Sequence, residues 1–418
     1  MKKLLALSAM TLAASSALAQ SSVTLYGIAD AGVWRASGIR GGSDTRLASG
    51  IMEGSRWGLR GNEDIGGGYR AVFTLENRFE LNDGSLGSRP PSGSQLPDRL
   101  TSTARLGLPG ALAPAVAGVA ASIGSTLGVN LSSNIFDRQA FVGLVTPVGA
   151  VLAGRQYTPG FEVNAAFDIM ETQSSLAVGQ LVGIPAGLDI RYNNTIQYRV
   201  QTGPFTANVM YGFGTIADDR KKNQLMGGMA MYRTDGFSFG LGYNTRNNEL
   251  AKKSLTSTVL GASYKFGGSK ISVLAGQIKD ENPSNLSTIS ATLQGATPAV
   301  PAAFANLVQA AFVEALKQDG RLYQIGYRFS TGANTLSVAY NRFDDRQRTG
   351  TNDTDVDSYG FVYTYSLSRR SDLNLVVTRF NNKNLGQAAP GGNGFLGGVS
   401  TSAGTDVNNY AFGLRHRF

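Results

Sequence analysis

The sequence contains no cysteine, one histidine and two tryptophans among its 418 residues. Without cysteine, neither disulfide bonds nor thiolate chemistry is available to the chain. The single histidine, His416, lies two residues from the C-terminus, where a structural or interfacial role is favoured over that of a catalytic base. A transition-metal site is poorly supported for the same reason. We therefore expect no enzyme activity, no metal and no cofactor.

Long uninterrupted apolar runs are also missing. Residues 106–136 and 282–313 carry no charge and are long enough to be mistaken for membrane helices. Seven glycines and prolines interrupt the first stretch, and Pro298 and Pro301 interrupt the second. We expect neither stretch to span a membrane as a helix. A shorter helix is predicted from Pro301 to Leu316, where apolar residues recur at three- and four-residue spacings.

Residues 1–19 are typical of a secretory signal peptide. Lys2 and Lys3 precede an apolar stretch, and Ala17-Leu18-Ala19 provides a cleavage site of small residues. Residues 20–418 then form the exported protein, and removal of the two lysines lowers the net charge from +9 to +7. This charge favours anions and acidic surfaces such as lipopolysaccharide phosphates, although net charge alone identifies no partner.

The strongest signal that is present is an alternation of apolar and polar residues over strand-length segments. Each segment has roughly the 9–11 residues that a tilted strand needs to cross a bilayer. Mean hydropathy is near neutral, as expected where lipid-facing and water-facing side chains alternate. Clear examples are residues 205–213, 237–243, 260–266, 323–329 and 359–365.

Two kinds of connection separate these segments, and they alternate along the chain. Seven are short turns, at residues 64–68, 147–149, 202–204, 234–236, 267–269, 331–334 and 368–371. Eight are longer loops, near residues 36–54, 81–135, 157–190, 214–223, 247–254, 280–320, 345–356 and 382–407.

Fifteen connections imply sixteen strands. We therefore predict an all-β fold, a 16-stranded antiparallel transmembrane β-barrel with short periplasmic turns and long extracellular loops. Closure of the barrel satisfies every backbone polar group without water. A soluble β-sandwich or propeller is the less favoured alternative.

Several motifs then carry a family resemblance. They are SSVTLYGIADAGV at residues 21–33, SRWGLRGNEDIGGGYRAVFTLENRF at 55–79, DRQAFVGL at 137–144, GRQYTPGFE at 154–162 and the closing GLRHRF. Together and in this order they resemble the general porins of Gram-negative bacteria, specifically the β-proteobacterial group. From about residue 214 to residue 400 the resemblance depends mainly on the rhythm of the strands.

The resemblance implies a homotrimeric, water-filled channel whose third loop folds inward to narrow the pore. The second loop departs from the pattern because the corresponding segment is shorter in relatives, where it reaches a neighbouring subunit. Its role here stays open. The terminal Phe418 resembles the aromatic residue that outer-membrane barrels present to the barrel assembly machinery.

Strand alternation and the resemblance together suggest the residues of the pore constriction. Alternation places Arg56, Arg60, Glu76 and Arg78 in the lumen. It also places Asp30 there, below the constriction, although a salt bridge on the periplasmic side is an equally good role for Asp30. Arg155 faces inward only if Leu152 and Gly154 face lipid. By resemblance, the wall comprises Arg56, Glu76 and Arg155 with Arg60 and Arg78 nearby, and the third loop contributes Asp168, Glu171 and Asp189.

Structural alternatives exist for several of these residues. Arg56 and Glu76 can simply pair across neighbouring strands, and Asp168 or Glu171 can cap a loop turn. Asp353, Asp355 and Asp357 can at most bind a hard cation weakly.

We therefore predict an outer-membrane porin for passive diffusion of small hydrophilic solutes and inorganic ions. An anion preference is favoured because the proposed wall is mostly arginine, although loop acids could reverse it. Expected partners are outer-membrane lipid and lipopolysaccharide, and no nucleic acid. A substrate-specific channel and a surface adhesin that uses the barrel as a platform are the alternatives.

Overall fold

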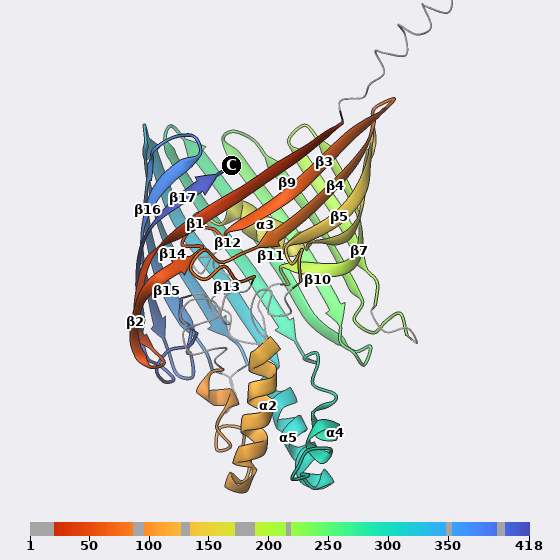
Figure 1. Ribbon diagram of the computed structural model, residues 1–418, viewed down its shortest axis with the longest axis vertical. Coiled ribbons are helices and arrows are strands. Elements are labelled where there is room, and N and C mark those ends of the chain that lie inside the picture. The colour runs from red at the N-terminus through yellow and green to blue at the C-terminus, as the bar shows by residue number, and fades with distance from the viewer. Residues whose placement is uncertain are drawn as a thin grey trace, which may run out of the picture.

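The computed structural model describes residues 21–86, 96–126, 134–171, 189–214, 219–347, 353–390 and 398–418. The predicted signal peptide lies outside these residues. The chain forms one closed antiparallel barrel with short turns at one end and long loops at the other (Figure 1). Both ends of the barrel-forming chain lie at the end with the short turns, as predicted.

Seventeen strand segments occupy sixteen positions around the barrel, which confirms the predicted number. The two counts differ because β2 and β3 pair with successive halves of β1. The segments are β1 Ser22–Ile39, β2 Gly42–Ser49, β3 Arg56–Gly66, β4 Tyr69–Arg78, β5 Gln139–Thr146, β6 Gly149–Tyr157, β7 Arg191–Thr202, β8 Phe205–Gly212, β9 Leu225–Arg233, β10 Phe237–Asn247, β11 Lys253–Phe266, β12 Ser269–Asp280, β13 Gln318–Thr331, β14 Asn334–Asp345, β15 Val356–Ser366, β16 Ser371–Asn382 and β17 Val407–Arg417.

The predicted first loop, residues 36–54, is mostly strand. β1 continues to Ile39, a tight turn follows, and β2 returns along it before the chain leaves the sheet at residues 50–55. The buried carboxylate of Asp30 accepts hydrogen bonds from the amides of Ile51, Met52 and Glu53, at 2.8–3.1 Å. These bonds satisfy the backbone amides that have no partner strand where the chain leaves the sheet. Asp30 therefore does lie inside the barrel, where it holds this inward segment.

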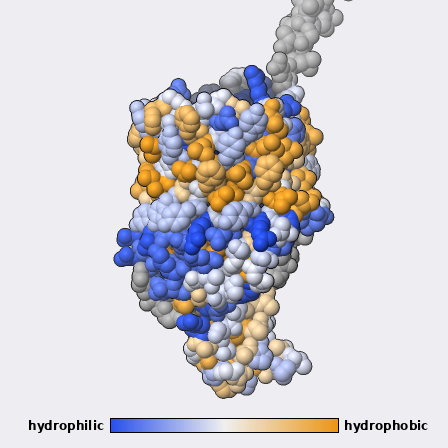
Figure 2. All heavy atoms as spheres, turned by 90° about the vertical axis from the view of Figure 1, so that its left-hand side faces the viewer, coloured by the Kyte–Doolittle hydropathy of each residue, from blue (hydrophilic) through white to orange (hydrophobic). Residues whose placement is uncertain are grey.

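The barrel closes between β1 and β17, and the C-terminal residue is part of the seam. Phe418 donates its amide to the carbonyl of Gly27 at 3.1 Å and accepts the amide of Gly27 at 3.0 Å. Tyr410, Phe412 and Leu414 are about half exposed on the outer face. On the face seen in Figure 2, apolar side chains cover the turn end of the barrel, and hydrophilic side chains lie between them and the loop end.

The second and sixth loops form a helical module beyond the barrel mouth (Figure 1). The second loop supplies η2 Asp98–Leu100, η3 Gly110–Leu112 and α2 Ala113–Thr126, and the sixth supplies α4 Ile289–Gln294 and α5 Ala302–Ala315. Their apolar side chains form a second core, separate from that of the barrel, which includes Leu100, Val116, Val308, Phe312 and Leu316.

This packing places the second loop, whose position the sequence left open, against the sixth loop of the same chain. Arg99, buried in the module, donates to the carbonyl of Ala315 at 2.5 Å. Arg40 pairs with Asp98 at 2.5 Å and ties the module to the end of β1. α5 confirms the helix predicted near residue 301. Among the described residues, no helix is long and apolar enough to cross a membrane.

The third loop enters the barrel, as the resemblance implied. α3 Pro159–Phe167 packs against the inner faces of β9, β10 and β11. Thr158 caps its N-terminus by accepting the amide of Phe161. Gly261 is required for this packing because a Cβ atom there would lie 2.4 Å from the ring of Phe167. Small residues on the inner wall thus provide the seat for the loop.

Candidate pore constriction

Glu76 is at the centre of a charged cluster on the inner wall opposite the seat of the third loop. The residue is 3% exposed. Its carboxylate accepts Nε of Arg138 at 2.7 Å and the hydroxyl of Tyr26 at 3.0 Å, and lies 3.7 Å from Nε of Arg56. Arg56 also donates to Glu53 at 2.7 Å. The pairing of Arg56 with Glu76, weighed as an alternative to pore lining, is therefore present inside the lumen.

The other predicted arginines of β3 and β4 lie on the same inner face. Arg56 and Arg78 are direct cross-strand neighbours, as are Arg60 and Thr74. Arg78 donates to Glu80 at 2.7 Å and is buried. The guanidinium of Arg60 lies 3.9 Å from the centre of the Tyr26 ring, in a cation–π contact, and Arg60 is exposed.

Arg138 and Arg191 complete the cluster, and neither was predicted. Both donate to the hydroxyl of Tyr157, at 2.8 Å and 3.2 Å, and the guanidinium of Arg191 lies 4.7 Å from the centre of that ring. Arg138 precedes β5 and Arg191 begins β7, so the alternation along the strands could not predict whether either side chain faces the lumen or the lipid. The only available signals were the position of Arg138 just after the second loop and that of Arg191 just after the third loop. We call Arg56, Arg60, Arg78, Arg138 and Arg191 the arginine wall.

Arg155 lies beside the arginine wall, although the premise that Leu152 faces lipid is wrong. Leu152 pairs with Gln197, which is buried on the lumen face. The register between β6 and β7 shifts between Gly154 and Gln156, so the alternation does not continue to Arg155, which interacts electrostatically with Tyr157 and Arg191. The guanidinium of Arg155 donates to the carbonyl of Asp137 at 2.7 Å and to Asn193 at 2.6 Å. These bonds make Arg155 a brace between the starts of β5 and β7.

The predicted acids of the third loop are all held by the far wall. Asp168 accepts the side-chain amide of Gln324 on β13 at 2.9 Å and the backbone amide of Met170 at 3.1 Å. Asp168 therefore caps a loop turn, the alternative role considered for it. Glu171 pairs with Arg328 on β13 and, at 3.6 Å, with Lys270 on β12. Asp189 pairs with Arg246 on β10 at 3.0 Å.

A fourth acid of this loop, Glu162, was not predicted. It pairs with Arg199 on β7 at 2.6 Å and accepts the side chain of Asn208 on β8 at 3.2 Å. Residues 172–188 contain no charged residue. Each acid of the third loop thus has its own partner, and the partners of the three predicted acids lie on β10, β12 and β13.

Positive charge is concentrated on one side of the site. Arg56, Arg78 and Arg138 pair with the carboxylates of Glu53, Glu76 and Glu80. Arg60 and Arg191 instead contact the rings of Tyr26 and Tyr157, so the five arginines of the wall outnumber its three carboxylates. A row of guanidiniums at the edge of a water-filled lumen raises the local concentration of anions. The geometry therefore suits the passage of small anions.

Asp355, Asp357 and His416 have partners of their own within the described part of the chain. No group of three or more His, Asp or Glu side chains there is arranged to hold a metal ion. Asp357 is occupied by Lys383 and Arg342, and Asp355 accepts the amide of Asp345. His416 shares a hydrogen bond of 2.8 Å with Ser371 between β16 and β17.

The chain is similar to known proteins in sequence and in structure. The profile of a family described as Gram-negative porin matches residues 6–385. Outer membrane porin protein 32 of Delftia acidovorans is 29% identical over 294 residues, which cover 67% of this chain and 70% of that protein. An outer membrane porin protein of Bordetella pertussis is 40% identical over 98 residues, which cover 20% of this chain and 26% of that protein.

Solved structures share the fold. The anion-selective porin from Comamonas acidovorans superimposes with a TM-score of 0.69 at 23% identity, and the match covers 96% of this chain and 100% of that one. A trimer form of OmpT from Vibrio cholerae gives a TM-score of 0.56 at 14% identity, with 95% and 99% coverage.

Proposed function

This chain belongs to the Gram-negative porin family, and from that premise we propose that it forms an anion-preferring diffusion channel in the outer membrane. Ions and small hydrophilic solutes cross it passively. The observation that carries the preference is the arrangement of charge in the lumen. The arginine wall has too few carboxylates to neutralise it, while the acids of the third loop are engaged by partners of their own.

The reversal potential of single channels in a salt gradient tests this proposal. The wild type is expected to favour anions. Arg56→Glu should move the preference toward cations, because it places a negative charge beside Glu76. Arg105→Glu, an equal charge change at an exposed position of the second loop, is the matched control and should change little. A cation-preferring wild type, or equal shifts for the two variants, would contradict the proposal.

We further propose that the protein assembles as a homotrimer. The family relationship supports this assembly, and the solved OmpT structure described as a trimer form has the same fold. Gel electrophoresis before and after heating provides the test. A heat-sensitive band at three times the monomer mass is expected, and a band at monomer mass alone would contradict the trimer.

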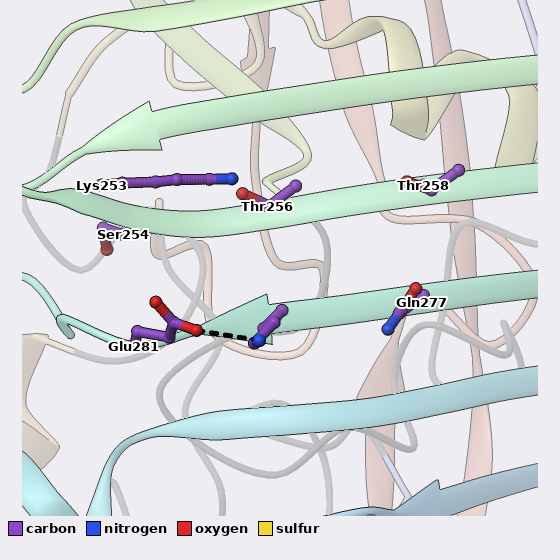
Figure 3. A pocket seen from close by; sticks show the side chains of 7 residues that line it. Lys253, Ser254, Thr256, Thr258, Gln277 and Glu281 are labelled. Carbon is purple, nitrogen blue, oxygen red and sulfur yellow. Dashed lines mark ion pairs between the residues drawn. The ribbon is translucent and has the colours of Figure 1, made fainter.

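Lipopolysaccharide is the proposed lipid partner on the outer wall. A groove of about 150 Å³ between the loop ends of β11 and β12 is lined by Lys253, Thr256 and Lys279, and Glu281 lies 2.8 Å from Lys279 (Figure 3). The exposed Leu260 lies on the same face of β11, nearer the turn end. Lysines beyond this apolar surface are positioned to meet phosphate groups of the outer leaflet.

Binding of lipopolysaccharide should therefore protect the folded barrel from heat. This protection should weaken when Lys253 and Lys279 are both changed to Gln. Lys265→Gln, on β11 at the turn end, is the control. Equal protection of all three proteins would remove this groove from the proposal.

Phe418 is proposed as the residue read by the barrel assembly machinery. It is the last residue of the chain and follows β17 directly. Its aromatic ring is about half exposed at the seam. Phe418 also closes the seam, and Gly27→Val tests that role separately because it disturbs the seam while leaving Phe418 in place.

A further inference from the structure

A cavity of about 560 Å³ lies within the helical module, between the second and sixth loops. Val119 and Ile123 of α2 form one side, and Ile289 and Leu293 of α4 form the other. Small-molecule sites commonly have volumes of about 300–1,000 Å³ and mainly apolar walls with a few polar groups. The cavity meets both conditions.

Three polar residues of the cavity, Arg246, Ser284 and Asn285, lie where the module meets the barrel, and the other three, Ser122, Thr288 and Thr292, belong to α2 and the start of α4. Arg246, on the inner face of β10, donates to the hydroxyl of Ser284 at 3.2 Å and pairs with Asp189. Ser284 and Arg246 both line the cavity. An occupant would therefore have its apolar part between the helices and a hydrogen-bonding group near Arg246.

The charges around Arg246 define the class of occupant. Asp189 lies 3.0 Å from its guanidinium, and Asp280 and Glu249 also interact with it electrostatically. Three carboxylates against one guanidinium disfavour an anion, which is the kind of solute that the arginine wall favours. The cavity and the pore thus select different chemistry.

We propose that this cavity is a binding site for an uncharged, mainly apolar organic molecule that carries one hydrogen-bond acceptor, such as a hydroxyl or carbonyl group. The apolar body packs between α2 and α4, and the acceptor faces Arg246. No residue of the arginine wall lines the site.

Gly118 provides a means to fill the cavity without disturbing the fold. It lines the cavity on α2, and a Cβ atom built there meets no atom within 4 Å. A larger side chain therefore has room to enter the space. Replacing glycine inside a helix also favours the helix, by about 0.5–1 kcal/mol. Gly118→Leu is expected to fold and to occupy the site.

The absence of cysteine from the chain allows a direct measurement of binding. Ser122→Cys introduces a single thiol on α2 in the lining of the cavity. The full-length protein is treated with N-ethylmaleimide with and without 2-naphthol, an uncharged aromatic alcohol, and alkylation is followed by mass spectrometry. At ten times its dissociation constant the probe leaves about a tenth of the sites free, so alkylation should be about tenfold slower.

Three comparisons decide the result. Adding Gly118→Leu should abolish protection, whereas Ala117→Leu, an equal gain in bulk at an exposed neighbouring position outside the lining, should preserve it. A thiol introduced by Ala303→Cys, on the exposed surface of α5, should react at the same rate with and without the probe. Protection that survives Gly118→Leu, or an unprotected thiol at position 122 up to the solubility limit of 2-naphthol, would overturn the proposal.

Discussion

Nε of Arg138 lies 2.7 Å from Oε1 of Glu76 on the inner wall, although 62 positions separate the two residues. The other carboxylate oxygen of Glu76 lies 3.7 Å from Arg56. Glu76 therefore holds together two arginines that would otherwise repel each other. It is also the central negative charge of the arginine wall, so it sets how much positive charge the pore presents.

Glu76→Gln should increase the anion preference of the channel. A unit charge about 8 Å from a passing ion is worth roughly 0.5–1 kcal/mol at an effective dielectric constant of about 40–80, which corresponds to a two- to fivefold change in permeability ratio. The reversal potential in a chloride gradient measures the ratio. Glu63→Gln, which removes an exposed carboxylate of β3, should leave it unchanged, and a lower anion preference in Glu76→Gln would refute the assignment.

Gln324→Leu should loosen the third loop. Gln324 accepts the amide of Ile169 at 3.0 Å and donates to Asp168 at 2.9 Å, and all three residues are buried. Each buried polar group left without its partner costs about 1–3 kcal/mol. We expect noisier open-channel current and more frequent spontaneous closures in planar bilayers. Gln277→Leu, on the exposed outer face of β12, should behave as the wild type, and an equally quiet Gln324→Leu channel would contradict the anchoring role.

Gly27→Val should weaken the seam of the barrel without removing its terminal aromatic residue. A Cβ atom at Gly27 would lie 2.3 Å from the ring of Phe418, so the ring must move. Such overpacking typically costs about 1–3 kcal/mol, and the folded band should convert at a lower temperature in heated gels. The amount of protein in the outer membrane should stay near that of the wild type if the assembly machinery reads Phe418.

Deletion of Phe418 is the complementary change. It removes both the terminal ring and the two backbone bonds to Gly27, so heat stability and outer-membrane yield should both fall. An unchanged yield after the deletion would refute the role in assembly while leaving the role in the seam.

The anchor of the sixth loop should weaken in acid. Burial tends to raise the pKa of Glu249, but the amides of Asn285 and Ser287 donate to its carboxylate and hold the pKa below its ordinary value of 4.5. A lowered pKa in the folded state contributes stability above pH 4.5 that is lost as the pH falls through the folded value.

Hydrogen exchange measures this effect directly. After correction for intrinsic rates, the amides of Asn285, Leu286 and Ser287 should be protected at pH 7 and less protected below pH 4. Glu249→Gln should show weak protection at both values. A wild type with equal protection throughout this range would show that Glu249 does not anchor the loop.

The strand count was predictable because each strand faces lipid on one side and water on the other. Tyr359, Phe361 and Tyr365 are all exposed on the outer face. Their alternating positions show, within one short segment, which side of the strand faces lipid. The first loop was predicted poorly for a related reason. Its strands extend beyond the apolar band, where polar residues such as Ser43 and Thr45 occupy β2 and resemble loop sequence.

The candidate site was only partly predictable. Arg56, Arg60 and Arg78 lie within regular strands, and alternation placed them on the inner face. Alternation could not place Arg138 or Arg191, which stand at strand ends. The partners of Asp168 and Asp189, 156 and 57 positions away in Gln324 and Arg246, depend on where the third loop crosses the lumen.

By itself, the sequence determined the barrel, its sixteen strands, the seam at Phe418 and the excess of arginine on the inner wall. These properties follow from the period of a strand and from the environment on either side of it, which are local constraints. Only the tertiary structure decided that Arg155 braces the starts of β5 and β7, that the loop acids are held by the far wall and that the second and sixth loops enclose a cavity. Contacts between distant segments determine these features, because a side chain's nearest charge or apolar neighbour is set by the path of the loops.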